Sequence, residues 1–226
     1  TNTGTDIIGG GNNGNATVSL SGTSVLNAAT TKWKTGDFGG TGNTGTTTIS
    51  LSNSAALTLK QFTIGHIGSA TATETVTLSG TSALNVNEFI TIGRDDNATT
   101  SGITSSLNLN GGTLSTQYIV KGSDNSDATK NLINANGGTI KALADQSDFF
   151  KLGTFNPGRV YVNLQAGGLT FNTNGFNVGI QNPLNGSGAL TKTGAGTLTL
   201  AGTNSYSGAT NVNNVTLQVV TGGSVA

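Results

Sequence analysis

The chain has 226 residues, among them 35 Gly, no Cys and no Met, and its ten basic and ten acidic residues give a net charge of zero. Charged residues make up only 9% of the sequence, which excludes a disordered polyelectrolyte and leaves no basic face for phosphate recognition. The lack of Cys excludes a disulfide framework, and no apolar run approaches the roughly 20 residues of a membrane-spanning helix. We therefore expect no nucleic-acid partner and no membrane span in this chain. Because residue 1 is not Met, we expect any export signal or anchor to lie outside these residues.

A phrase of alternating apolar and small polar residues recurs about every 29 residues. Copies begin at Thr17, Thr48, Thr75 and Ser106, and more degenerate ones begin at Asn131 and Thr197. The period of two is typical of a strand with one buried face. The predicted inward residues are Val18, Leu20, Ile49, Leu51, Val76, Leu78, Leu107, Leu109, Ile133 and Ala135.

Two further strands complete each repeat. A second inward position follows each phrase after a short corner, and some corners contain Gly-Gly pairs because Gly accepts a positive φ. The residues at this position are Leu26, Leu57, Leu84, Leu114, Ile140 and Leu169. A third strand is predicted at 62–65, 90–93 and 118–122, and Ile7-Ile8-Gly9 fits the same slot.

Three strands and three corners per repeat predict an all-β fold, a three-faced parallel β-helix of roughly seven to eight coils. A meander of hairpins is the alternative, but it would not place one phrase in the same register five times. Coils about 4.8 Å apart would give a rod on the order of 35–40 Å long. We expect one domain over residues 1–226, with regular coils in 1–152, irregular coils with an insertion in 153–189 and a distinct last part in 190–226.

The last part carries the most specific motif, which reads LTKTGAGTLTLAGTNSYSGATNV over residues 190–212 and LQV over 217–219. It resembles the autotransporter-associated β-strand repeat, which occurs in autotransporter passenger domains and in very large exported bacterial β-helix proteins. Val215 stands where that family usually has Gly, and this departure bears on the corner before the last strand. The resemblance implies a right-handed parallel β-helix that is secreted or displayed on the bacterial cell surface. It does not imply one biochemical activity.

Charged residues follow the third strand of several repeats. Asp37, His66, Arg94 and Asp95 occupy this place, so a regular register would align them along one corner. β-Helix polysaccharide lyases and hydrolases build sites from such columns, and paired carboxylates could support glycoside hydrolysis. A solvated polar corner is the competing interpretation, because fold analogy alone does not carry function. We favour the solvated corner and expect no enzyme activity.

Two loops have the oxygen-rich composition of calcium sites. Asp124 and Asp127 bracket an Asn-Ser pair, and Gly39-Gly40-Thr41-Gly42-Asn43 is similar to the start of a calcium-binding nonapeptide. Neither loop is in tandem, and neither has the closing Glu of an EF-hand. Ordinary loop composition explains both, so we expect no metal and no cofactor.

The ends of the sequence suggest an assembly function. Neither end shows a capping helix or charged loop, which predicts assembly edges at Ile7, Ile8, Leu217 and Val219. Head-to-tail stacking through these edges would form an open homopolymer. The main hypothesis is therefore an extracellular structural filament. An autotransporter passenger adhesin that contacts glycans or a host surface is the alternative, and a polysaccharide-active enzyme is a third.

Overall fold

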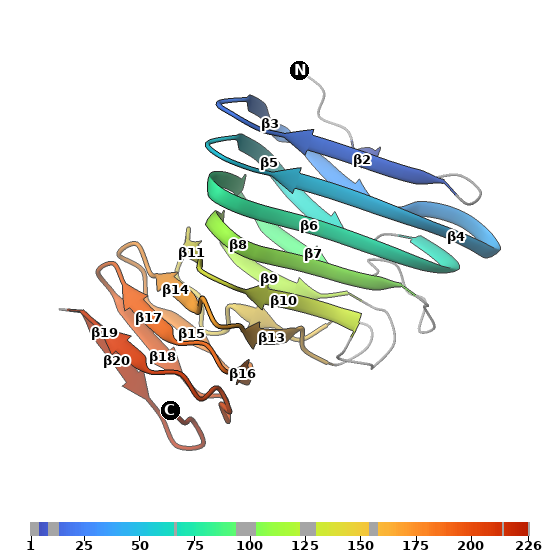
Figure 1. Cartoon of the computed structure of the whole chain (residues 1–226). Coiled ribbons are helices and arrows are strands. Elements are labelled where there is room, and N and C mark those ends of the chain that lie inside the picture. The colour runs from blue at the N-terminus through green and yellow to red at the C-terminus, as the bar shows by residue number, and fades with distance from the viewer. Residues whose placement is uncertain are drawn as a thin grey trace.

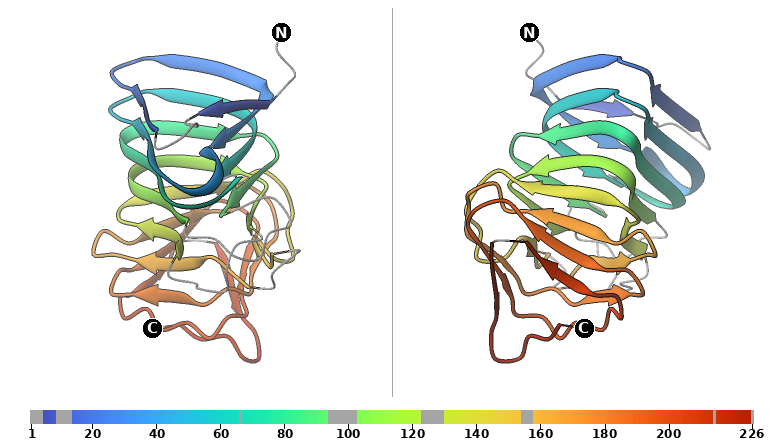
Figure 2. Two further views of the ribbon diagram at one scale, coloured as in Figure 1. Left: turned by 90° about the vertical axis from the view of Figure 1, so that its right-hand side faces the viewer. Right: turned by 60° about the vertical axis from the view of Figure 1, so that its left-hand side comes forward.

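A computed structural model of the chain describes residues 5–8, 14–65, 67–93, 103–122, 130–153, 158–213 and 215–225, of which 7, 37–43 and 67–71 are described by their backbone alone. The described residues are built from β-strands that wind into one stack (Figures 1 and 2). The strands are β1 (Thr5–Ile8), β2 (Asn15–Leu20), β3 (Val25–Thr35), β4 (Asp37–Leu51), β5 (Ala56–Ile64), β6 (Ile67–Val86), β7 (Phe89–Ile92), β8 (Thr104–Thr116), β9 (Tyr118–Lys121), β10 (Asn131–Ala135), β11 (Gly138–Ala142), β12 (Phe150–Lys151), β13 (Tyr161–Leu164), β14 (Leu169–Asn172), β15 (Val178–Ile180), β16 (Leu184–Gly186), β17 (Leu190–Thr193), β18 (Thr197–Leu200), β19 (Thr210–Val212) and β20 (Thr216–Val219).

The first ladder contains the recurring phrase. It passes from β2 through the phrase-bearing parts of β4, β6 and β8 to β10 and β13, with every pairing parallel. These steps amount to about five turns of a parallel β-solenoid. The register aligns each copy with the next, so Leu20, Leu51 and Leu78 are partners in sequence. The predicted parallel β-solenoid is confirmed.

The second ladder lies after the first corner and contains the second inward position. Leu26, Leu57 and Leu84 align as predicted, and Leu114 and Ile140 continue the column. The assignment of Leu169 to this column is wrong, because Leu169 pairs with Gly138 and Phe171 pairs with Ile140. Leu169 and Phe171 are both inward residues of β14. The offset from the preceding phrase therefore could not tell which of the two aligns with Ile140.

The third ladder begins with β1, which pairs with the second half of β3 and so occupies the predicted slot. It continues through the second half of β5 into β7, β9 and β12. The late copy of the phrase at Thr197 was placed in the wrong ladder. β18 pairs with β15 and β20 in a separate three-stranded sheet, whereas β16 extends the first ladder. Alternation in Thr-Leu-Thr-Leu marks a strand with one buried side but cannot tell which ladder receives it.

The interior is one continuous apolar column. The predicted inward residues from Ile49 to Ala135 are fully buried. Three buried aromatic rings fill the lower interior, where the ring centroid of Phe149 lies 5.2 Å from that of Phe150 and 5.0 Å from that of Phe171. Because each coil covers the side chains of the one before it, burial is a property of neighbouring coils and not of one coil alone.

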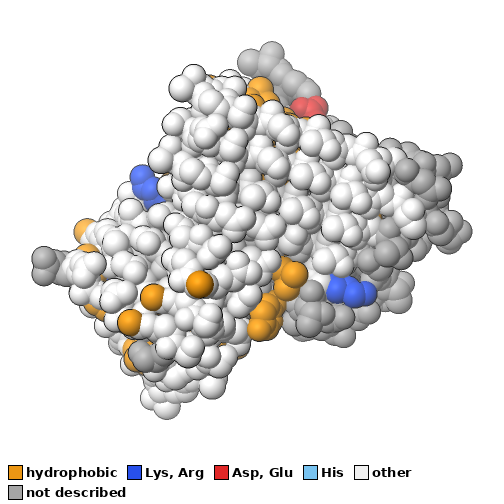
Figure 3. All heavy atoms as spheres, in the orientation of Figure 1, with side chains coloured by type: hydrophobic (Ala, Val, Ile, Leu, Met, Phe, Trp, Pro, Cys, Tyr) orange, Lys and Arg blue, Asp and Glu red, His pale blue; other side chains and the backbone are white. Residues whose placement is uncertain are grey.

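The outer side of the first ladder is a hydroxyl and amide surface. In Figure 3, which shows this side, charged side chains are few and lie toward the edges. Asn108, Asn134, Asn163 and Asn185 align across successive coils. The Asn134 amide donates to Asn108 at 2.9 Å, and the Asn163 amide donates to Asn134 at 3.4 Å. These uncharged groups solvate the rod and also bind each coil to the next.

Candidate functional site

The predicted charged corner lies mostly outside the described residues. Asp37 opens β4, where its backbone pairs with Ile67. His66, Arg94 and Asp95 fall outside the described ranges, as do the calcium candidates Asp124 and Asp127. The structure therefore does not test the column or the calcium loops. Within the described ranges, no cluster of His, Cys, Asp and Glu has the size needed to hold a metal ion.

A buried polar column occupies the start of the first ladder. Thr47, Glu74 and Ser105 are register partners on successive coils, and each is fully buried. Thr47 and Glu74 lie two residues before the inward Ile49 and Val76 on the same strands. Because side chains alternate along a strand, these polar side chains also point into the core. Burial without compensating hydrogen bonds is costly for such groups. The column is thus a local departure from the apolar interior.

The carboxyl of Glu74 has no hydrogen-bond partner among the described residues. Burial raises the pKa of Glu74 to about 7, and the nearby hydroxyls of Thr47 and Thr35 oppose this shift without forming bonds of normal geometry. The Thr35 hydroxyl instead accepts from the Gly65 amide at 2.8 Å. Glu74 therefore exchanges its proton near neutral pH inside the solenoid.

A second buried charge lies in the resemblance region. Lys192 is the register partner of Phe171 and faces inward on β17. Its ammonium donates to the Thr173 hydroxyl at 2.8 Å and to the carbonyls of Thr193 and Gly194 at 2.8 and 2.6 Å. Burial lowers the pKa of Lys192. These bonds hold the ammonium against the corner that follows β17. Lys192 occupies an inward position of the alternating pattern, and this position is the signal in the sequence that could have identified it.

A stacked pair lies outside the third ladder. The rings of Phe89 and Tyr118 are 5.1 Å apart and nearly parallel, and the Lys151 ammonium lies 3.7 Å from the Tyr118 ring centroid. Burial and the Glu88 carboxylate raise the pKa of Tyr118. Because Phe89 covers one face of the Tyr118 ring and Lys151 lies over the ring as well, the pair does not form an open platform for a sugar.

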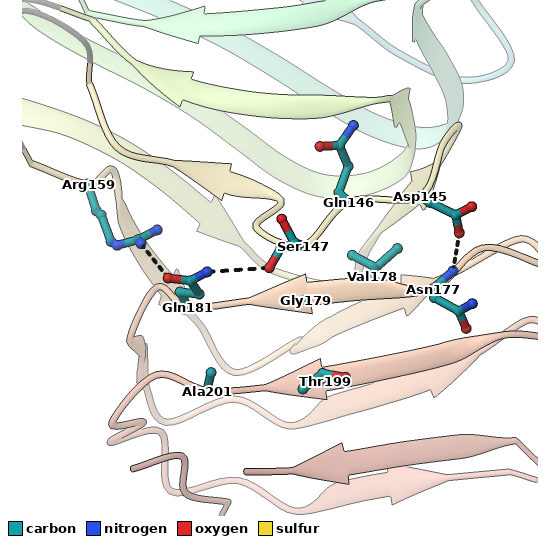
Figure 4. A pocket seen from close by; sticks show the side chains of 10 residues that line it. All are labelled: Asp145, Gln146, Ser147, Arg159, Asn177, Val178, Gly179, Gln181, Thr199 and Ala201. Carbon is teal, nitrogen blue, oxygen red and sulfur yellow. Dashed lines mark hydrogen bonds between the residues drawn. The ribbon is translucent and has the colours of Figure 1, made fainter. Parts of the chain in front are cut away.

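A groove of about 620 Å³ lies beside β15 and β18 (Figure 4). It forms where the segment before β12 leaves regular alternation: Phe149 and Phe150 are consecutive and both fully buried. Two adjacent inward side chains cannot follow a period of two, and the four residues before them, 145–148, are exposed or half-buried. The lining residues are Asp145, Gln146, Ser147, Arg159, Asn177, Val178, Gly179, Gln181, Thr199 and Ala201.

The walls of the groove are held by hydrogen bonds and one ion pair. Arg159 pairs with Asp148 at 2.8 Å, and both side chains are largely buried. Arg159 also donates to the Phe150 carbonyl and to the Gln181 side-chain oxygen, the latter at 3.4 Å. Gln181 in turn donates to the Ser147 carbonyl at 3.5 Å. At the other end of the groove, the Asn177 backbone amide donates to the Asp145 carboxylate at 2.7 Å.

Residues of the C-terminal motif fasten consecutive coils to one another. The Asn204 side chain accepts from the Leu184 amide at 2.8 Å and donates to the Ser224 carbonyl on the following coil. Tyr206 is buried, and its hydroxyl lies 2.6 Å from that of Thr210. The corner at Val215 is formed despite the missing Gly, since β20 begins at the next residue and pairs in register with β18.

Comparison with known protein families gives a match within the C-terminal motif. Neither curated proteins nor solved structures give a match to the chain. The described part of the chain has no helix with the length and apolar character needed to cross a membrane. Residues 190–219 match the family described as the passenger-associated-transport-repeat, which confirms the resemblance predicted from the sequence. The last coils of this parallel β-solenoid are therefore similar to a repeat of autotransporter passengers.

Proposed function

We propose that the chain is part of an exported, passenger-type β-solenoid that acts at the bacterial cell surface or after release, as a scaffold and not as an enzyme. The observation that carries this proposal is the match of residues 190–219 to the passenger-associated-transport-repeat. In the structure these residues form β17 to β20, which continue the parallel stacking of the preceding coils. The uncharged hydroxyl and amide exterior suits a rod that displays ligand-contacting loops.

Surface labelling of intact cells tests this proposal. An antibody against residues 1–226 should stain unpermeabilised cells of the source bacterium or detect the chain in the medium. External protease should remove the cell-bound signal, while a cytoplasmic marker protein serves as the control for cell integrity. Staining that appears only after permeabilisation, with none in the medium, would contradict export.

The finer geometry forms part of the same proposal. We infer that residues 1–226 form one solenoid domain with three faces, a right-handed coil and seven to eight turns. The handedness rests on the strong preference of parallel crossover connections for the right-handed form. The first ladder extends past β13 to β16, and the Ser205 amide donates to the Leu184 carbonyl at 2.8 Å, which supports turns beyond the regular ones.

End-to-end stacking of two copies is a second candidate function. At one end of the stack Leu26 is 37% exposed, whereas its register partner Leu57 is fully buried. At the other end Val219 is 43% exposed, whereas its partner Leu200 is fully buried. Both are inward positions that a further coil would cover. Ile8 and Leu217 pack partly against the core beside them, at the predicted assembly edges.

Sedimentation velocity over a wide concentration range tests the stacking of copies. The wild-type chain should form concentration-dependent oligomers, and Leu26→Glu combined with Val219→Glu should abolish them because each substitution places a carboxylate at an inward position of the junction, where burial of a charge is costly. Leu152→Glu is the matched control, since Leu152 is 52% exposed but directly follows β12, which belongs to neither end coil. A monomeric wild-type chain at every concentration would refute the stacking of copies.

A further inference from the structure

The groove beside β15 retains polar groups that its own hydrogen bonds do not use. One carboxylate oxygen of Asp145 accepts from the Asn177 backbone amide, and the second oxygen accepts no hydrogen bond from a described residue. The Asn177 side-chain oxygen accepts from the Thr197 backbone amide at 3.1 Å, whereas its side-chain nitrogen has no hydrogen bond to a described residue. The Gln146 side chain forms no hydrogen bond to any described residue, and Figure 4 shows it extending away from the other wall residues. The groove thus offers a ligand hydrogen-bond acceptors and donors that lie on neighbouring coils.

The floor of the groove is formed by residues with small side chains. Gly179 and Thr199 are outward register partners on β15 and β18, and the Gln218 side chain on the next coil accepts from the Thr199 hydroxyl at 3.4 Å. A Cβ at position 179 would lie 2.3 Å from the Ser147 carbonyl oxygen, so only Gly permits this approach. Ala201 continues the small surface. A ring with an apolar face can lie on such a floor while its edges meet the polar walls.

The backbone around the groove excludes a peptide added as a strand. One edge of β15 pairs with β18. The other edge is taken by the preceding coil, since Gly179 donates to Gln146 at 2.7 Å and Phe149 donates to Gly179 at 2.8 Å. Strand addition needs a free edge, and the groove offers none.

The charge of the groove excludes an anionic ligand and argues against catalysis. Arg159 is neutralised by Asp148, so Asp145 remains as a carboxylate without a cation partner among the described residues. Anions would be repelled, and apolar ligands would leave the wall groups unpaired. Glycoside hydrolysis uses two cooperating carboxyl groups, whereas one of the two near this groove is held in an ion pair.

We propose that this groove binds a short segment of a neutral oligosaccharide. Planar amides and carboxylates can each pair with neighbouring sugar hydroxyls, which both donate and accept hydrogen bonds. The volume of about 620 Å³ lies within the range of small-molecule sites. This binding function goes beyond the scaffold function and does not depend on the route of export.

Saturation-transfer difference NMR with purified protein tests the proposal. The neutral probes are cellotetraose, maltotetraose and tetra-N-acetylchitotetraose, and tetragalacturonate is the anionic probe. At least one neutral probe should bind in the millimolar range or tighter, and tetragalacturonate should bind more weakly. Gln146→Ala and Asn177→Asp should each weaken neutral binding at least fivefold. The second variant keeps the acceptor for Thr197 while it removes the free donor.

Gln165→Ala is the matched control, because Gln165 is a half-buried glutamine at a corner away from the groove. It should leave binding unchanged, and unfolding curves should show that all three variants remain folded. The proposal is overturned if no neutral probe binds, if tetragalacturonate binds best, or if Gln146→Ala and Gln165→Ala bind equally. Because none of these results concerns cell-surface labelling, failure here leaves the export proposal standing.

Discussion

Glu74→Gln is expected to stabilise the solenoid by about 3 kcal/mol above pH 8 and to change its stability little below pH 4. The pKa of Glu74 is about 7 in the folded chain, against an ordinary value of 4.5. The folded state therefore binds the proton more tightly than the unfolded state does, and the wild type loses stability as the pH rises from 4.5 to 7. The loss levels off above pH 7, at about 3 kcal/mol for this difference in pKa.

Urea unfolding between pH 4 and pH 8.5 measures this effect. The glutamine variant should show a flatter pH dependence than the wild type, because it mimics the protonated carboxyl. Glu88→Gln is the control, since Glu88 lies half-exposed at 3.7 Å from Lys60. It should not flatten the profile. Parallel profiles for the wild type and Glu74→Gln would show that Glu74 is not buried as described.

Gly196→Ala is expected to destabilise the last coils by more than about 3 kcal/mol. Gly196 has a φ of +86°, and a Cβ there would lie 2.1 Å from the carbonyl oxygen of Phe176 on the previous coil. The contact is with backbone, so relief requires the two coils to separate. Strain in φ and separation of coils both act against the folded state.

Gly175→Ala separates these two causes. Gly175 has a nearly equal φ of +94°, but a Cβ there meets no atom within 4 Å. Its substitution should cost only the strain of a positive φ, about 1 kcal/mol. Thermal unfolding of both variants measures the difference. Equal losses would show that coil spacing at Gly196 adjusts freely, and would contradict the steric explanation.

The fold was largely predictable because alternation is repeated in register. Inward residues such as Ile49 and Leu107 recur at the same place in each repeat, and their burial follows from that place. The ladder of Thr197–Leu200 was not predictable, because a strand with one buried side fits any ladder of a solenoid. Glu74 and Lys192 occupy inward positions of the alternation, so the phase of the strand predicts their burial even though a polar residue contributes nothing to the apolar pattern.

The groove could not be predicted from the repeat, because it depends on a break in the repeat. Phe149 and Phe150 both face inward, and only the folded interior shows that the Phe149 ring packs edge-to-face against both Phe150 and Phe171. Asp145 and Asn177 lie far apart in the repeat pattern and meet through a backbone amide. Such contacts between an irregular segment and the next coil have no signal in spacing or composition.

The orientation of the ladders also has a mechanical consequence. Hydrogen bonds between coils run along the axis of the stack, so tension applied between its ends acts on the bonds of one terminal coil at a time. Each coil that detaches would release about 20 to 30 residues, or roughly 65 to 100 Å of extended chain, while the coils behind it remain folded. The Asn108–Asn134–Asn163 ladder adds side-chain bonds along the same direction and raises the force at which these three coils separate. A rod of this kind would lengthen stepwise under load and absorb work before it breaks.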